Sequence, residues 1–432
     1  MLALKSWMLN RRVGWAEGFF VLGVLLKPFY VFPSGSVGLA DICMAVCACI
    51  LLAGNIRDRK GFALERKDLL LYIFLVCVCL INGIYYIKFR SREYLIFTVY
   101  WLYAGMIVWS FRQVGGRPEM ALLLKNVLQI SLLLQLLIWM TGMGRTYYEY
   151  WGATRYMGTF NNPNQMAYIV FLMLLLLFFY EKRQLYFWPF WLISGILIVV
   201  TKSTGVFLGW AGLGGFEAVA FLHCFCKRSE RRRKVWRLLW GLAAAGIIVG
   251  LWVIWPAADF RIEDTDYSLL ARIQEKIYKI WTGGLQGLIY DRGWERLILY
   301  PKYLLFGAGE GDYGRFPLSV WKSEVHSTFL SVWFYYGTVP LALFLGWLYQ
   351  NLKDNIRKYW PVYAALLLEC MIVINYRQPF FWMVILAGCV THKNTFGGKN
   401  ETGNRIMGKV DGTGSGGSCS KAGIGRNLWK RK

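Results

Sequence analysis

The chain has 432 residues, of which 56% are hydrophobic and 17% are charged, whereas a soluble domain carries about 25% charged residues. Apolar stretches long enough to cross a bilayer as helices recur along the whole chain, which excludes an ordinary soluble globular protein. The net charge of +24 comes from Lys and Arg scattered between these stretches, so the chain lacks the continuous basic face that nucleic-acid binding requires.

The apolar stretches predict an all-α polytopic membrane protein with about twelve transmembrane helices. Lys and Arg are enriched in alternate loops, so the positive-inside rule places those loops and both termini in the cytoplasm; only the loop at residues 88–92 disagrees. We expect residues 1–392 to form the membrane domain and residues 393–432 to form a flexible basic cytoplasmic tail. The predicted spans are 17–33, 37–54, 68–87, 94–111, 120–141, 164–180, 185–201, 204–226, 236–255, 325–349, 359–375 and 379–391.

Two longer segments connect spans on the predicted outer side, namely residues 142–163 and the large extracytoplasmic loop at residues 257–324. Apolar residues at helical spacing over residues 266–281 predict an amphipathic helix at the membrane surface, with Asp266 as its N-cap. A second helix follows, and Pro301 bends or ends it.

The ten cysteines predict neither disulfides nor a metal site. All of them except Cys419 lie inside or at the end of apolar runs, and no Cys-x-x-Cys pair occurs. We therefore expect small packing side chains, with no bound metal and no cofactor.

The segment "RYMGTFNNPNQMAY" at residues 155–168 places an unusual number of polar groups directly before an apolar span. Pro163 suits the first turn of a helix, and an asparagine before it can cap that helix. The free amides at this helix end would then face outward, toward an anionic or sugar-rich ligand. The alternative is simply a well-capped span. The candidate binding residues here are Arg155, Asn161, Asn162 and Asn164.

His326, one of three histidines, opens the tenth predicted span in "SEVHSTFLSVWFYYG". An imidazole at the outer interface is a candidate general base or ligand. Glu324 could orient the ring or be the base itself. The competing interpretation is an interfacial histidine bonded to a loop carbonyl.

Arginines of the large outer loop are candidates for binding phosphate, because the planar guanidinium binds phosphate oxygens in pairs. Arg292 and Arg296 are four residues apart and would share one face of a helix. The turn "FGAGEGDYGRF" contains Gly309 and Arg315, and its glycines permit close backbone approach. Alternatively, loop arginines reach toward lipid headgroups.

Three motifs resemble the O-antigen ligase and O-antigen polymerase superfamily of bacterial envelope glycosyltransferases. In chain order they are "RYMGTFNNPNQMAY", the outer-loop helix with its turn "FGAGEGDYGRF", and "SEVHSTFLSVWFYYG". That family has an Arg-x-x-Gly-x-Phe-x-x-Pro-Asn element, a Gly-x-Gly turn after an arginine-bearing helix, and a His-(Asn/Ser)-x-x-Leu motif. The resemblance covers roughly residues 150–350, and the twelve-span layout agrees with it. Ser327 is a departure, since many members have Asn after the histidine.

The resemblance implies a GT-C-like fold and a metal-independent, inverting transfer from an undecaprenyl-diphosphate-linked oligosaccharide at the outer face of the bacterial cytoplasmic (inner) membrane. His326, with Glu324, would be the base or its orienter, and Arg155 with Arg292 or Arg296 would hold the diphosphate. Polymerisation of a surface polysaccharide (O-antigen, capsule or exopolysaccharide) is the favoured function, with polysaccharide export or chain-length-control proteins as further partners. Transfer to a non-repeat acceptor, as in a ligase, is the alternative.

Two other classes remain, namely a multi-span transporter of solute or lipid-linked glycan and a non-catalytic scaffold. Transporters usually carry charged residues inside the membrane. Here Lys27, Asp41 and Glu369 are the few such residues. The long outer loop with its arginines has no evident role in transport.

Overall fold

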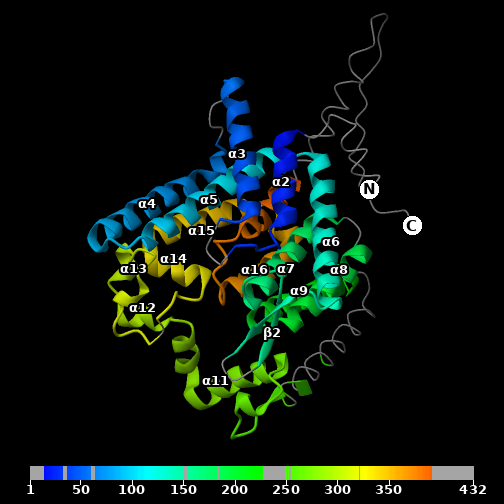
Figure 1. Ribbon diagram of the computed structural model, residues 1–432, viewed down its shortest axis with the longest axis vertical. Coiled ribbons are helices and arrows are strands. Elements are labelled where there is room, and N and C mark those ends of the chain that lie inside the picture. The colour runs from blue at the N-terminus through cyan, green and yellow to red at the C-terminus, as the bar shows by residue number, and fades with distance from the viewer. Residues whose placement is uncertain are drawn as a thin grey trace, which may run out of the picture.

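The computed structural model of the protein describes residues 14–32, 37–59, 64–149, 153–181, 184–226, 254–320 and 322–391, with a few positions between 241 and 252. These residues are mostly helical, and Figure 1 shows the helices gathered into one bundle. Within the described ranges, six helices have the length and composition of membrane spans, and three shorter apolar helices accompany them. The predicted tail at 393–432 and most of the predicted span at 236–255 lie outside the described residues.

The N-terminal helices follow the predicted spans closely, except that the first helix ends well before residue 33. It ends at Leu26, although Lys27 keeps helical backbone, because Pro28 has no N–H with which to continue the helix. The helices of this half are α2 (Trp15–Leu26), α3 (Leu39–Arg57), α4 (Leu69–Phe89, preceded by the 3-10 turn η1, Arg66–Asp68), α5 (Glu93–Val114) and α6 (Pro118–Met140).

A two-stranded antiparallel sheet, which the sequence did not predict, follows α6. Strand β1 (Arg145–Tyr148) pairs with β2 (Thr154–Gly158), and Thr and Tyr side chains suit such strands. Gly158 ends β2 with a positive φ of 56°. Its left-handed backbone turns the chain toward the next helix.

Helix α7 (Pro163–Tyr180) is the centre of the bundle, and nearly all of its side chains are buried. Asn162 caps it, because its side chain accepts a hydrogen bond from the Asn164 N–H at 2.8 Å, and Pro163 occupies the first turn. The predicted helix start is therefore confirmed. Helices α8 (Gln184–Val200) and α9 (Thr204–Cys226) pack beside α7.

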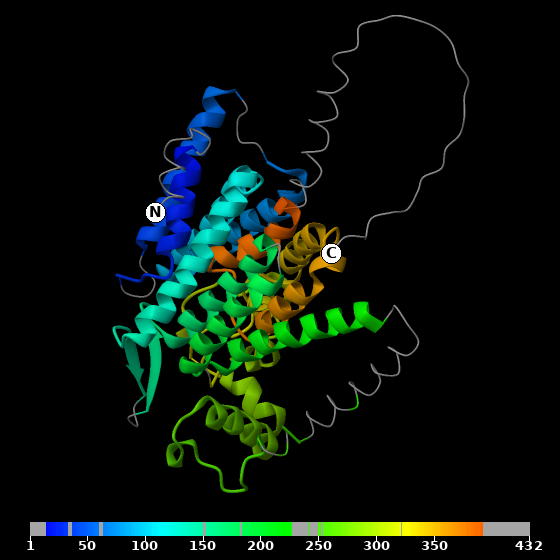
Figure 2. The same ribbon diagram turned by 90° about the vertical axis from the view of Figure 1, so that its right-hand side faces the viewer.

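The large loop contains the predicted amphipathic helix as α11 (Leu269–Asp291), after the 3-10 turn η2 (Ile262–Asp264). Asp266 is not its N-cap. Ser268 takes that position, accepting from the Ala271 N–H at 3.2 Å, and Asp266 instead accepts from the Ser268 N–H at 3.0 Å. Figures 1 and 2 both show α11 and the β1–β2 hairpin on the same side of the bundle.

Helix α11 bends at Gly284, where φ is 61° and ψ is −160°. Lys279 reaches across the bend to Asp291, at 3.3 Å between charged atoms. The bend brings the end of α11 back toward its first half. Beyond it lie α12 (Glu295–Leu299) and α13 (Tyr303–Phe306), separated at Pro301 as predicted, and then the 3-10 turn η3 (Tyr313–Arg315).

The predicted single span at 325–349 is wrong, because it is two helices, α14 (Thr328–Tyr336) and α15 (Thr338–Leu352). Gly337 separates them with φ 86°, and a Cβ there would lie 2.5 Å from the Leu305 carbonyl oxygen. Close approach of the α13 backbone therefore sets the break. Helix α16 (Ile356–Cys370) and a last helix, Pro379–Thr391, complete the described bundle.

Candidate active site

His326 lies in the segment that enters α14, against the end of α11. Its backbone N–H donates to the Arg292 carbonyl at 2.9 Å, and its own carbonyl accepts from Trp294 Nε1 at 3.1 Å. Ser327 caps α14 by accepting from the Leu330 N–H. The position of the histidine is thus fixed by backbone contacts on both sides, next to Arg292.

Four charged groups lie near enough to the imidazole to shift its pKa: Glu324, Arg292, Arg377 and Arg296. Burial lowers the pKa of His326, the three guanidinium groups lower it further, and Glu324 opposes them without reversing the shift. The ring is consequently neutral at pH 7. A neutral imidazole is the form that accepts a proton from a hydroxyl group.

Glu324 is paired with an arginine that the sequence analysis did not select. Its Oε2 atom accepts from Arg377 Nη1 at 2.5 Å. Burial opposes ionisation of Glu324, but the charges of Arg377 and His326 bring its pKa below the ordinary value. Glu324 is therefore a carboxylate at neutral pH, which makes it a weaker base than the neighbouring imidazole.

Arg292 and Arg296 do not share a helix face. Arg292 ends α11, Gly293 breaks the helix with φ 68°, and Arg296 lies in α12. Arg296 is 0% exposed and donates to Ser319 Oγ at 3.0 Å and to the Tyr335 hydroxyl at 3.4 Å. Arg292 is partly exposed, and its Nη1 donates to the Ile372 carbonyl at 2.9 Å. Of the two, Arg292 is the one that a ligand can reach.

Arg155 and the asparagines at the start of α7 lie at the same end of the bundle as His326. Arg155 Nη2 donates to Asn164 Oδ1 at 2.6 Å, and its Nε donates to the Thr201 carbonyl at 3.0 Å. Asn161 instead turns to the loop after α2, donating to the Phe32 carbonyl at 2.7 Å. Asn162 and Asn164 are exposed, whereas Arg155 is buried.

Two cations of α11 connect Arg155 with Arg292. Arg272 and Lys276, one helical turn apart, share a face of α11. Burial lowers the pKa of Arg155 to about 10, with Arg272 as the next cause. Burial, followed by Arg292 and Arg272, lowers the pKa of Lys276 to about 8. Arg155, Arg272, Lys276 and Arg292 are therefore close enough to repel one another, and we call them the cation row.

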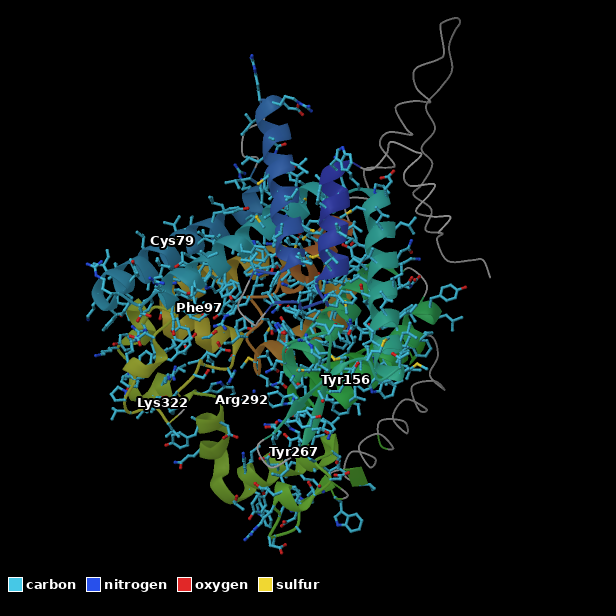
Figure 3. The ribbon with its side chains drawn as sticks, in the orientation of Figure 1. Cys79, Phe97, Tyr156, Tyr267, Arg292 and Lys322 are labelled. Carbon is cyan, nitrogen blue, oxygen red and sulfur yellow. The ribbon has the colours of Figure 1, made fainter. Side chains whose placement is uncertain are left out.

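A tyrosine and a carboxylate hold one end of the cation row in place. Arg272 Nη1 donates to the Tyr267 hydroxyl at 3.0 Å, and that hydroxyl donates to Glu149 Oε1 at 2.9 Å. Glu149 also lies 3.8 Å from Arg155 Nη1. Figure 3 labels Tyr267 and Arg292 in this region, between α11 and the bundle.

No protein-family model matches the chain, and no curated protein matches it either. The resemblance to the O-antigen ligase and polymerase superfamily therefore stays a prediction.

Gly309 and Arg315 are not part of the group around His326. Gly309 has φ 70°, and a Cβ there would lie 2.7 Å from Tyr85 Cδ2. Arg315 donates to the carbonyls of Ala308 and, at 2.8 Å, Gly309, and its guanidinium lies 4.8 Å from the Tyr85 ring centroid. Both residues pack the glycine-rich turn against Tyr85 of α4.

Arg377, Arg272 and Lys276 were not selected from the sequence, although signals for them existed. Arg377 lies between the predicted spans 359–375 and 379–391, in a loop that the alternation of charges places on the outer side. Arg272 and Lys276 have the spacing of neighbours on one face of the predicted amphipathic helix.

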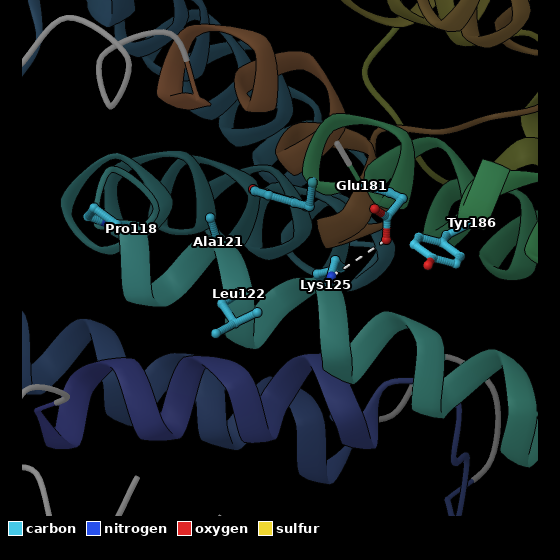
Figure 4. Close-up of a pocket in the computed structure, with 7 residues that line it drawn as sticks. Pro118, Ala121, Leu122, Lys125, Glu181 and Tyr186 are labelled. Atoms are coloured by element: carbon cyan, nitrogen blue, oxygen red, sulfur yellow. Dashed lines mark ion pairs between the residues drawn. The ribbon is translucent and has the colours of Figure 1, made fainter. Parts of the chain in front are cut away.

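A separate hollow of about 430 Å³ lies at the opposite end of α6 and α7 (Figure 4). There Lys125 and Glu181 form an ion pair at 3.6 Å, beside Tyr186. None of the sequence-predicted site residues lines it. Among the residues that the structure describes, no group of three His, Cys, Asp or Glu side chains could hold a metal ion.

Proposed function

We propose that the chain is a membrane glycosyltransferase that polymerises a bacterial surface polysaccharide from undecaprenyl-diphosphate-linked repeats. The observation that carries this proposal is the position of a neutral imidazole, His326, beside Arg292, which is the end of the cation row nearest to it, at one end of an apolar bundle. The proposal includes a GT-C-like fold with about twelve spans, as the family resemblance implies.

The site end of the bundle is proposed to face away from the cytoplasm. Arg57, Arg112 and Arg117 lie at the opposite ends of their helices, where positive charge is typical of cytoplasmic loops. This orientation, in the bacterial inner membrane with both termini in the cytoplasm, gives the site access to a lipid-linked donor that has already been moved outward.

The donor contains a diphosphate, and the cation row offers it four positive charges. Arg292 and Lys276 are partly exposed, so phosphate oxygens can reach them. Guanidinium and ammonium groups fixed in advance stabilise the charge that develops as a diphosphate departs. The exposed amides of Asn162 and Asn164 would bind sugar hydroxyls nearby.

The acceptor is a sugar hydroxyl, and His326 is the proposed base. As the acceptor oxygen attacks the anomeric carbon, its proton passes to the imidazole. The bond from that carbon to the diphosphate oxygen breaks on the opposite face, and the electron pair leaves with undecaprenyl diphosphate. Attack opposite the leaving group inverts the configuration at the anomeric carbon.

Transfer is tested with the purified full-length chain in lipid nanodiscs supplied with extracted lipid-linked oligosaccharide. We expect release of undecaprenyl diphosphate and lengthened saccharide, with both lost in His326→Gln and Arg292→Gln. Lys279→Gln, which removes a cation that is already paired with Glu275 and Asp291, is the matched control and should remain active. With the same chain in sealed lipid vesicles, saccharide that crosses the membrane with its diphosphate bond intact would instead indicate a transporter.

The same assay separates a polymerase from a ligase. A polymerase lengthens saccharide when the lipid-linked repeat is supplied alone. A ligase releases undecaprenyl diphosphate only after a non-repeat acceptor has been added. No release in either case would refute the proposed function.

A further inference from the structure

Glu310, in the glycine-rich turn, is 0% exposed, and both oxygens of its carboxylate accept hydrogen bonds. The hydroxyls of Tyr336 and Tyr376 donate to it at 2.7 Å each, Trp101 Nε1 donates at 3.2 Å, and Arg377 Nη2 donates at 2.6 Å. Four donors from separate parts of the chain fix this carboxylate in one position. A buried polar network of this kind specifies a rigid geometry around the groups that it holds.

Arg377 is held between two carboxylates. Its Nη2 bonds Glu310 at 2.6 Å, its Nη1 bonds Glu324 at 2.5 Å, and its guanidinium lies 4.6 Å from the Phe97 ring centroid. Two carboxylates compensate its single charge, so Arg377 has little attraction left for a phosphate. In this respect it differs from Arg292, whose guanidinium donates to a neutral carbonyl, that of Ile372.

We infer that Glu310, Arg377 and Glu324 form a positioning relay that holds a carboxylate beside His326 and leaves the imidazole as the group that takes the proton. This inference rests on the proposed transfer reaction. Glu310 fixes Arg377, and Arg377 fixes Glu324. Glu324 in turn stabilises the imidazolium that forms when the acceptor hydroxyl gives its proton to His326.

The relay explains why two neighbouring candidate bases have different roles. Arg377 occupies Glu324 with a charged hydrogen bond, which disfavours proton uptake by that carboxylate. The charges that act on His326 come from four parts of the chain. Glu324 belongs to the same segment as His326, Arg292 to the end of α11, Arg296 to α12 and Arg377 to the loop before the last helix. Among these groups, Glu324 is the carboxylate that favours the charged ring.

Histidine titration tests the relay without relying on enzyme activity. The chain has three histidines, so the full-length protein labelled with ¹³C-histidine gives few NMR signals, and His326→Gln identifies the relevant one. Glu324→Gln removes the favourable charge and should lower the pKa of His326 by about one unit. Arg377→Met frees Glu324 from its fixed position and should also lower the pKa of His326, although it removes a positive charge. Arg377→Lys, which keeps a charged donor to the carboxylate, should stay near the wild type.

A lowered pKa in Arg377→Met is the signature of the relay, because the loss of a positive charge alone would raise the pKa of His326. Arg112→Met is the matched control, since Arg112 is another buried arginine, paired with Asp68 at 2.9 Å at the far end of the bundle. It should lower stability and leave the His326 titration unchanged. Unchanged titration in folded Glu324→Gln, or a raised pKa of His326 in folded Arg377→Met, would overturn the inference.

If Arg377→Met does not fold, Glu324→Gln and Arg377→Lys decide the matter, because the relay requires a lowered pKa in the first and an unchanged pKa in the second. Activity then separates the relay from the proposed function. In an active protein, Glu324→Gln should lower kcat at least tenfold with little change in KM. A wild-type protein that releases no undecaprenyl diphosphate refutes the transferase, and the NMR titration still decides the relay.

Discussion

Replacement of Arg292 and of Arg296 should have opposite consequences, although the two residues are four positions apart. Arg296 is 0% exposed and bonds Ser319 Oγ at 3.0 Å and the Tyr335 hydroxyl at 3.4 Å. Its guanidinium also lies 5.0 Å from the Phe316 ring centroid. Ser319 in turn donates to Glu295, a buried carboxylate, at 2.5 Å.

Arg296→Met removes the positive charge from this buried group while leaving the carboxylate in place. Breaking a buried charge network on one side costs about 3–5 kcal/mol. Arg292→Gln loses one hydrogen bond, to the Ile372 carbonyl at 2.9 Å, from a partly exposed side chain, which costs about 1 kcal/mol. Its effect on transfer should be far larger, about 100-fold or more in kcat, because a preorganised charge at the leaving group is lost.

The two effects are measured by thermal unfolding in detergent and by release of undecaprenyl diphosphate. We expect Arg296→Met to unfold at a clearly lower temperature. Arg292→Gln should unfold near the wild-type temperature and be almost inactive. Wild-type transfer by Arg292→Gln, or wild-type stability of Arg296→Met, would refute the distinction between the two arginines.

Three further predictions concern single positions and the assay conditions. Gly309→Ala should destabilise the chain by about 1–3 kcal/mol in thermal unfolding, because its φ is 70° and its Cβ would meet Tyr85; Gly314→Ala, with open space around its Cβ, is the control. Because the pKa of Lys276 is lowered to about 8, its charge is present below that pH and lost above it. Pyrophosphate affinity, measured by calorimetry, should therefore fall from pH 7 to 9 in the wild type, but not in Lys276→Arg; an equal fall in both would contradict this role. Chelation with EDTA should leave transfer unchanged, and a loss restored by a divalent cation would contradict metal independence.

Much of the bundle could be predicted because a membrane span has a simple signal. The helices Thr204–Cys226 and Pro379–Thr391 begin and end where the apolar runs do. The break at Gly337 could not be predicted in this way, because it depends on the Leu305 backbone passing beside that glycine. Composition within a window does not report such a tertiary contact.

The candidate site was only partly predictable, because neighbours in space are not neighbours in sequence. Placing Arg292 and Arg296 on one helix face followed from their spacing, but Gly293 adopts a left-handed backbone and ends α11 between them. Likewise, Asp266 had the residue type of an N-cap, but Ser268 stands directly before the first helical residue. In both cases one residue with non-helical backbone changed the outcome.

The positive charges of the site end fall into two groups, and the difference gives each a separate role. Arg377 and Lys279 each bond two carboxylates, so their charge is satisfied within the protein. The Lys276 ammonium group forms no hydrogen bond or ion pair with any residue that the structure describes. It shares a face of α11 with Arg272. Burial and the charges of Arg292 and Arg272 lower its pKa to about 8. Mutual repulsion of this kind is destabilising in the unliganded protein, and binding of an anion relieves it. The compensated cations are therefore suited to positioning other side chains, and the uncompensated ones to binding a ligand with several negative charges.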